Sequence, residues 1–374
     1  MPINFRFGWR STGILPVWMW LGFWVVLFVS TVKAERSTSF EFLNLPASAR
    51  TSALGGAGVA EAKGWAGAQI NPAGLGRLRR DEVAFSSVRW IDDVNYHSAG
   101  YAHPFLNGGA LSGSIVSVDY GDIAAFSPTG GPEGTTGAKD TGVRLGYGRS
   151  WRDRLQWGIQ GVYARENLAG ETAQSLAADG GVLWAPFLTG PLRTLSVGGA
   201  FRNWGQDPRY GDITEPLPRT IQAGLNLCPF IEGASLSLDE IFSPTQSPSF
   251  VAGAEYWARG AVALRLGYNG LTAREGSGLT MGLGFRAWDM EVDYSFIGYG
   301  DLGETHHVGL TYRFGQLAEK HYALGLVSLQ KKDYAEAVIH FAQSVSVDPK
   351  NRRALEKLRE ANTLLQNQAK PTVR

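Results

Sequence analysis

The chain has 374 residues, its 35 Lys and Arg nearly balance its 34 Asp and Glu, and this balance argues against nucleic acid as a partner. The only cysteine, Cys228, excludes an intrachain disulfide framework and a cysteine-rich metal site. The length suits two or three ordinary domains or one large β-barrel with an appendage, and 48 glycines with 11% aromatic residues favour the barrel.

Residues 1–34 are predicted to be a secretion signal. Arg6 and Arg10 form a basic start, residues 14–30 form an apolar core, and Ala34 precedes the expected cleavage site. The alternative is an uncleaved membrane anchor, because the apolar run reaches the lower limit of what spans a bilayer.

Residues 35–81 do not alternate as strands do, and they are rich in alanine, glycine and small polar residues. Such a segment, entering from the periplasm, is predicted to fold into the barrel lumen as a plug, because its small side chains let its backbone pass close to the wall. Gly55 and Gly56 begin "GGAG", which plug packing explains better than a phosphate loop, since no βαβ unit surrounds it and no Lys-Ser/Thr pair follows.

The sequence "NPAG" near the end of this segment suits a turn. Asn71 can bond back to its own backbone, Pro72 fixes φ at the next position, and Gly74 supplies a conformation that other residues avoid. We predict that this motif is the hinge that fixes the plug against the wall.

Residues 82–315 break into amphipathic segments of about ten residues, the length that a tilted strand needs to cross a bilayer. Leu279, Met281, Leu283 and Phe285 alternate with small or polar residues, and this period of two indicates strands. About fourteen strands are predicted, at 82–90, 95–103, 108–119, 140–150, 155–165, 174–185, 192–203, 218–227, 231–239, 248–257, 261–270, 278–287, 289–297 and 304–314.

The predicted connections alternate between short and long. Residues 121–139 and the stretch from Trp204 to Leu217 are the long ones, and both are expected to be outer loops. Short periplasmic turns, longer outer loops and an even strand number are typical of outer-membrane barrels, with both ends of the barrel in the periplasm.

A soluble β-sandwich or propeller is the alternative to a membrane barrel. Aromatic residues near the predicted strand ends argue for the barrel, because they suit an interfacial girdle. They are Trp90, Tyr120, Trp151, Tyr163, Trp184, Trp204, Trp257 and Trp288.

The stretch "THHVGLTYRFG" (305–315) has the pattern of a last barrel strand. His307, Gly309, Tyr312 and the terminal aromatic Phe314 resemble the C-terminal signal by which outer-membrane barrels are handed to the barrel-assembly machinery. We therefore interpret Gly315 as a domain boundary rather than as a premature terminus.

Residues 316–370 change to helix-forming composition. Small, aromatic and proline residues recur at the spacing of a tetratricopeptide repeat, with a capping helix predicted at 352–368; a generic helical hairpin is the alternative. The packing positions are Gly325, Tyr334, Ala337, Phe341, Val345 and Pro349. One repeat buries little surface, so this domain is expected to dock on the barrel mouth or on a periplasmic or secreted protein.

Two passages, "FLNLPASARTSALGGAGVAEA" (42–62) and "AQINPAGL" (68–75), resemble the N-terminal signature of the PorV/PorQ family of outer-membrane proteins, which are similar in fold to the FadL fatty-acid transporters. The resemblance covers 40 to about 315. It implies a fourteen-stranded barrel with an N-terminal segment in its lumen, and two roles: passage of hydrophobic solutes, or a part in type IX protein secretion.

Charged residues predicted on the inner face either line a pore or hold the plug by charge pairs. Buried charges need partners, and this favours the plug. The residues are Arg144, Arg202, Arg265, Arg286, Arg313, Glu291 and Asp293.

An outer-membrane hydrolase is the enzymatic alternative. Asp92 and Asp93 and the pair His306–His307 approach one another on barrel closure, but adjacent histidines on a strand face opposite sides, and no GxSxG or HExxH occurs. We therefore expect a protein that is not an enzyme and needs no cofactor or metal.

The sequence thus predicts a mainly β, plugged barrel in the lipid of the outer membrane, with a helical periplasmic tail. The preferred function is protein secretion or assembly, with the tail as a docking module. The alternative is a FadL-like channel with a hydrophobic ligand in its lumen.

Overall fold

The computed structural model describes residues 37–369 apart from 92–93, 107, 128, 152–153, 188–191, 230, 275, 316 and 350. The predicted signal sequence and the pair Asp92–Asp93 lie outside the described residues. The wall strands are β1 (Asp81–Arg89), β2 (Asn95–Pro104), β3 (Gly109–Phe126), β4 (Pro132–Trp151), β5 (Leu155–Leu168), β6 (Glu171–Trp184), β7 (Leu195–Gly205), β10 (Thr220–Leu227), β11 (Ala234–Phe242), β12 (Ser249–Ala258), β13 (Val262–Asn269), β14 (Leu279–Ala287), β15 (Met290–Gly298) and β16 (Glu304–Phe314).

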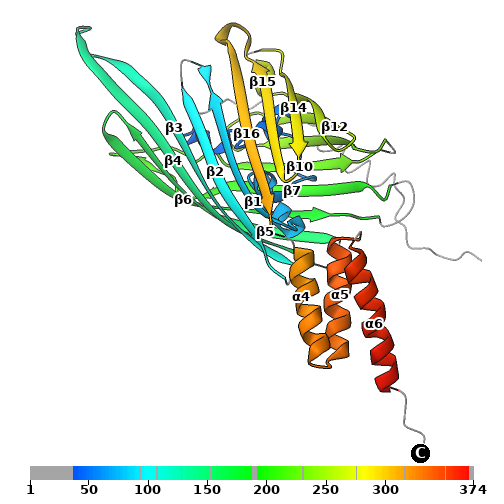
Figure 1. Cartoon of the computed structure of the whole chain (residues 1–374). Coiled ribbons are helices and arrows are strands. Elements are labelled where there is room, and N and C mark those ends of the chain that lie inside the picture. The colour runs from blue at the N-terminus through cyan, green and yellow to red at the C-terminus, as the bar shows by residue number, and fades with distance from the viewer. Residues whose placement is uncertain are drawn as a thin grey trace, which may run out of the picture.

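These fourteen strands form one closed antiparallel barrel, which confirms the predicted fold class (Figure 1). Each strand pairs with its neighbour along the chain, and β1 closes on β16 with Asp81 opposite Phe314 and Arg89 opposite His306. Because the strand number is even, the barrel begins and ends at the same end. We call it the tail end, because the helical tail follows there, and the opposite end the distal end.

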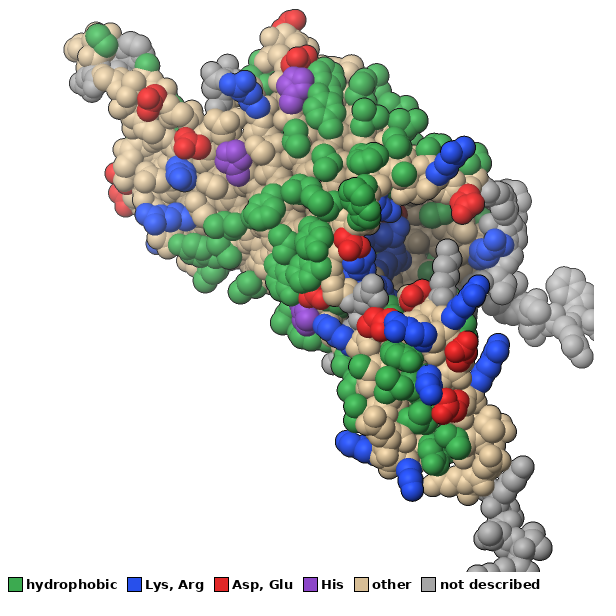
Figure 2. Space-filling model, in the orientation of Figure 1, with side chains coloured by type: hydrophobic (Ala, Val, Ile, Leu, Met, Phe, Trp, Pro, Cys, Tyr) green, Lys and Arg blue, Asp and Glu red, His purple; other side chains and the backbone are tan. Residues whose placement is uncertain are grey.

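Side chains alternate along the strands as predicted. In β14 the outward residues Leu279, Met281, Leu283 and Phe285 are exposed, whereas the intervening residues face the lumen. Figure 2 shows the hydrophobic side chains gathered in a band over the barrel wall. A closed wall with this exterior satisfies its backbone groups internally and offers lipid an apolar surface.

The predicted loop at 121–139 is a strand extension instead. β3 and β4 continue their pairing through Asp122–Gly137 and Ala125–Gly134, after a register shift that follows Asp119, and a turn begins at Ser127. The alternation of inward and outward side chains is interrupted at this shift, so the parts of each strand before and after it do not follow one continuous pattern. The result is the long hairpin that projects at the distal end in Figure 1.

The second predicted loop, Trp204 to Leu217, also has structure. It contains the short hairpin β8 (Arg209–Tyr210) and β9 (Ile213–Thr214), and it folds back into the lumen, where Leu217 is buried. Pro216 O accepts a hydrogen bond from Ser39 N (3.1 Å).

The predicted aromatic girdle is correct only in part. Trp151, Trp184, Trp204, Trp288 and Tyr163 are exposed on the outside. Trp90 and Tyr120 instead pack against the apolar core in the lumen, and Trp257 lies under the guanidinium of Arg286 at 4.0 Å. The sequence predicts where the strands end, but whether a side chain at a strand end points inward or outward depends on the register of the strand.

Residues 37–80, which we call the lumenal segment, contain η1 (Glu41–Asn44), α2 (Ala49–Ala53), α3 (Gly64–Ala68) and η2 (Pro72–Arg77). Inward-facing glycines of the wall make room for it on opposite sides of the barrel. A Cβ at Gly158 of β5 would collide with the backbone of Pro72, and one at Gly253 of β12 would lie 2.9 Å from Leu54 O. Contacts with walls this far apart place the segment inside the lumen.

An apolar core fills the distal part of the lumen. Phe40, Phe42 and Leu43 of the lumenal segment pack there with inward valines of the β1–β5 wall, with Tyr96 and with Leu217. The N-terminal part of the segment is therefore held at the distal end, and the segment runs back to β1 at the tail end.

Three helices follow the barrel: α4 (Leu317–Gln330), α5 (Tyr334–Val347) and α6 (Arg352–Ala369). Ala337 and Phe341 are fully buried between them, and a Cβ at Gly325 would lie 2.7 Å from the Phe341 ring. Asp333 caps α5 by accepting a hydrogen bond from Glu336 N (3.1 Å), and Pro349 follows the end of that helix. The helices pack mainly on one another and project from the tail end (Figure 1).

None of the described helices combines the length and the hydropathy that a membrane-spanning helix needs.

Candidate functional site in the barrel lumen

Helix α2 packs on the inner face of the wall formed by β13–β16, and an arginine clamps it to the neighbouring strand β12. Ser48 begins the helix by accepting a hydrogen bond from Thr51 N (3.2 Å). Arg50 then makes a bidentate pair with Glu255 of β12, with both nitrogen–oxygen distances at 2.9 Å, and reaches Glu61 of the lumenal segment at 2.6 Å. Two carboxylates thus fix one guanidinium between segment and wall.

The clamp continues into a larger group that we call the charge network: Arg50, Glu61, Glu82, Glu255, Arg265, Arg286, Glu291, Asp293 and Arg313. The side chain of Arg265 is fully buried and bonds Glu255 at 2.7 Å and Asp293 at 2.6 Å. Arg313 joins the network by pairing with Glu291 (2.7 Å) and Glu82 (2.8 Å).

The charge network also holds the second helix of the lumenal segment. Glu82 accepts a hydrogen bond from Trp65 N (2.8 Å), so a wall carboxylate caps α3, where Lys63 provides no side-chain cap. Four arginines together with Lys63, which pairs with Glu61, face five carboxylates. Removing one member would leave a buried charge without its partner, at a typical cost of about 3–5 kcal/mol.

Backbone groups of the lumenal segment are bonded to the wall as well. Asp239 of β11 accepts hydrogen bonds from Gly58 N (2.7 Å) and Val59 N (2.9 Å), and Gln222 of β10 bonds the same carboxylate oxygen at 2.8 Å. A single inward carboxylate therefore holds a turn of the segment that has no ladder partner.

The predicted hinge residues lie where the lumenal segment meets β6. Asn71 is fully buried, donates to Val59 O (2.9 Å) and Val182 O (3.0 Å), and accepts from Ala73 N (3.0 Å). Pro72 is the first residue of η2, and a Cβ at Gly74 would lie 2.9 Å from the backbone of Ala62.

Gly55 and Gly56 form the turn that ends α2. Both have positive φ, and a Cβ at Gly55 would lie 2.6 Å from Tyr268 O. Their carbonyls accept hydrogen bonds from Asn269 Nδ2 (2.9 Å) and Gln222 Nε2 (3.1 Å). The turn therefore requires glycine for both its conformation and its proximity to the wall.

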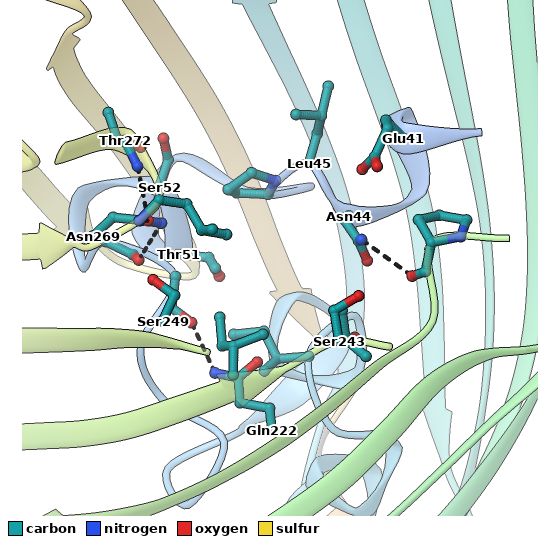
Figure 3. Close-up of a pocket in the computed structure, with 18 of the residues that line it drawn as sticks. Glu41, Asn44, Leu45, Thr51, Ser52, Gln222, Ser243, Ser249, Asn269 and Thr272 are labelled. Atoms are coloured by element: carbon teal, nitrogen blue, oxygen red, sulfur yellow. Dashed lines mark hydrogen bonds between the residues drawn. The ribbon is translucent and has the colours of Figure 1, made fainter. Parts of the chain in front are cut away.

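Two cavities lie on opposite sides of the lumenal segment. The distal cavity has a volume of about 450 Å³, and α2 presents Thr51 and Ser52 to it. The tail-end cavity has a volume of about 530 Å³, and the same helix presents Ala49 and Arg50 to it. Figure 3 shows the distal cavity, and Figure 2 shows basic side chains in the hollow between barrel and tail. Helix α2 thus separates the two cavities on the side of β13–β16, and α3 with the residues that follow it continues the partition, since Trp65 and Ala66 line the tail-end cavity and Gln69 and Ile70 the distal one.

The residues of the predicted assembly signal lie on both faces of β16. His307 and Gly309 face the lumen, where His307 Nε2 bonds Ser86 Oγ at 2.5 Å. Tyr312 and Phe314 stack with a centroid distance of 5.5 Å, and Phe314 stacks further on Tyr101 at 6.4 Å.

Of the residues named for the hydrolase alternative, only the two histidines lie among the described residues. His306 faces outward and bonds Tyr294 (2.7 Å), whereas His307 is buried in the lumen. Within the described ranges no cluster of three His, Cys, Asp or Glu side chains is placed to hold a metal ion.

Sequence reasoning missed three of the wall carboxylates, Glu82, Asp239 and Glu255. Each occupies an inward position of a strand whose other face is apolar. An acidic residue at such a position is the signal that could have revealed them, because a carboxylate facing a filled lumen needs a donor.

The structure defines the chain as a transmembrane β-barrel of the outer-membrane type, since its wall is closed, antiparallel and apolar outside, with its lumen occupied by its own N-terminal segment. No family model and no curated protein matches the chain.

The chain is similar to several solved structures. They include a "TodX monoaromatic hydrocarbon channel" mutant, with 12% identity, a TM-score of 0.49 and coverage of 74% of this chain and 100% of the other. A Pseudomonas aeruginosa FadL homologue has 11% identity, a TM-score of 0.47 and coverage of 75% and 100%. The Acinetobacter baumannii outer membrane protein Omp33 has 10% identity, a TM-score of 0.39 and coverage of 63% and 98%.

Proposed function

We propose that the protein is a non-enzymatic outer-membrane channel for small molecules, in which α2 closes the pathway by separating the two lumenal cavities. The observation that carries this proposal is the presence of a ligand-sized space on each side of one short helix. Moving α2 would join the spaces without opening the wall.

The attachment of α2 suits a part that moves. Ala49 and Ala53 face Gly309 and Gly282 of the wall, so no large side chains interdigitate between the helix and the wall there. Helix α2 is attached to the wall by the Arg50 clamp and by hydrogen bonds such as that from Thr280 Oγ1 to Ala53 O. Water can replace such polar contacts when the helix shifts. The distal cavity also has apolar lining from Leu45, Ile70 and Ile297, which supports the FadL-like alternative more than the secretion role.

The experiment is uptake of small solutes into proteoliposomes. Arg50→Gln removes the clamp and is expected to increase flux several-fold over the intact protein. Arg353→Gln is the matched control, because Arg353 pairs with Glu319 (2.8 Å) in the helical tail and lines neither cavity. Absence of flux in all three proteins would contradict the proposal.

Secretion or assembly is the second candidate, because α4–α6 pack mainly on one another and project from the barrel. A periplasmic tail would then capture periplasmic or secreted proteins, as the PorV/PorQ resemblance implies. Deletion of 316–374 should abolish capture of a defined secreted protein and leave the barrel folded. If capture survives the deletion, the tail is not the docking module.

A further inference from the structure

About half of the residues that line the distal cavity carry uncharged hydrogen-bonding side chains. They come from α2, from β10 and from the connection between β11 and β12, so they surround the space from several sides (Figure 3). Examples are Thr51, Ser52, Gln222, Ser243, Thr245 and Gln246. A cavity built for a hydrocarbon alone would not carry these groups, because an apolar ligand would strip water from them without replacing its hydrogen bonds.

Some of these side chains have hydrogen-bonding capacity left over. Gln222 uses its amide nitrogen on Gly56 O and Asp239, while its Oε1 accepts nothing from the described residues. Ser243 Oγ and Thr245 Oγ1 lie 3.0 Å apart and share one hydrogen bond, and Ser243 Oγ also accepts from Thr245 N (3.3 Å), so the capacity to accept another bond lies mainly on Thr245 Oγ1. The cavity therefore offers both donors and acceptors to a ligand.

The charged residues around the cavity do not select one sign. Glu41, Arg202 and Arg274 line it, and Arg274 already donates to Ser247 O (3.4 Å). With two arginines and one glutamate around it, an ion of either sign would meet a like charge as well as an opposite one, whereas a neutral ligand meets no such repulsion.

Two aromatic rings complete the lining. Trp90 and Tyr299 lie with ring centroids 5.6 Å apart and planes inclined by 50°. Tilted rings offer an apolar surface to the flat face of a saturated ring, whose edge hydroxyls would then reach the amides and hydroxyls.

We propose that the distal cavity binds a neutral polyhydroxylated ring compound, of the size of one or two sugar units. This inference rests on the proposed channel function and specifies its ligand. The volume of about 450 Å³ falls in the range of about 300–1,000 Å³ that is usual for small-molecule sites.

The test is calorimetric titration of the full-length protein, in a sugar-free detergent, with maltose, glucuronate and octanoate. Maltose is expected to bind saturably and more tightly than either anion. The variant Thr245→Val/Gln246→Leu removes hydrogen-bonding groups from a connection outside the wall strands and should weaken maltose binding by about tenfold. The matched control Thr135→Val/Gln174→Leu changes exposed residues of β4 and β6 and should bind as the wild type does.

Each other outcome overturns the inference. Octanoate or glucuronate binding without maltose binding would contradict the neutral-ligand assignment, while flux into proteoliposomes would leave the channel proposal standing. Equal maltose affinity in variant and control would place the binding elsewhere. If no probe binds and no solute crosses, both proposals fail.

Discussion

At the scale of single residues, the lumen is organised by polar groups that face inward from an apolar wall. The side chain of Arg265 is completely buried and is bonded directly by two carboxylates, Glu255 and Asp293. Glu255 also pairs with Arg50, so it joins the wall to the lumenal segment. Asp239 and Asn71 hold backbone groups that no strand pairs. Inward polarity therefore attaches the segment and leaves little room for an open polar pore.

Asn71 gives a direct test of these contacts. Asn71→Ala should lower the free energy of unfolding by about 2 kcal/mol, because Val59 O and Val182 O lose their donor and Ala73 N its cap. Asn71→Asp should cost more, because it turns acceptor oxygens toward two carbonyls. Urea titration of the full chain, followed by tryptophan fluorescence, measures both; an Asn71→Asp variant as stable as the wild type would refute the assigned contacts.

At the scale of elements, the strands were predictable and their extensions were not. Outward Leu, Met and Phe alternating with inward small or polar residues located all fourteen strands, because lipid on one side and a filled lumen on the other impose period two. The sequence predicts a loop where β3 and β4 in fact extend, because neither face must be apolar beyond the membrane and the register shift after Asp119 breaks the period of two.

The projecting hairpin should be dispensable for the barrel. Its residues 123–136 pair with each other, so replacing them by a short turn removes few contacts with the rest of the wall. The melting temperature of the shortened protein should stay within about 2 °C of the wild type, because few interactions are lost. A fall of about 10 °C or more, in thermal scans of both proteins, would show that the hairpin supports the barrel.

The tail should lose stability in mild acid. His321 of α4 is buried, its ring centroid lies 5.9 Å from that of His340, and burial followed by the nearby His340 charge lowers the pKa of His321 below its usual 6.5. The neutral form is thus favoured in the folded state. The contribution of neutral His321 to the stability of the tail is therefore fully present above about pH 6.5, and it is lost as the pH falls from that value toward the pKa of the folded state.

Hydrogen exchange of the α4 amides in the full chain, corrected for intrinsic rates, measures this effect at pH 7.5 and pH 5.5. Protection should decrease at the lower pH in the wild type and change less in His321→Phe, which cannot titrate there. Equal pH dependence in both proteins would assign the effect to another group.

At the scale of the whole molecule, the arrangement is a closed wall, a filled lumen and a helical appendage at one end. The small-residue composition of 35–81 predicts a segment inside the lumen, because small side chains let a backbone pass close to the wall, and the described residues 37–80 lie there. Its attachments were not predictable, since Glu82, Asp239 and Glu255 meet their donors only after barrel closure. The two cavities likewise depend on where α2 comes to rest.

The central claim is that α2 must move for solutes to pass, and a reversible lock tests it most directly. A Cβ added at Gly309 would lie 3.5 Å from Ala49 Cβ, within the range for a disulfide. The variant to test therefore carries Ala49→Cys and Gly309→Cys together with Cys228→Ser. Its control carries Ala49→Cys and Cys228→Ser alone and cannot form the cross-link. We predict that oxidation abolishes solute flux into proteoliposomes, that reduction restores it, and that the control is indifferent to both. Undiminished flux through the oxidised, fully cross-linked protein would contradict the account.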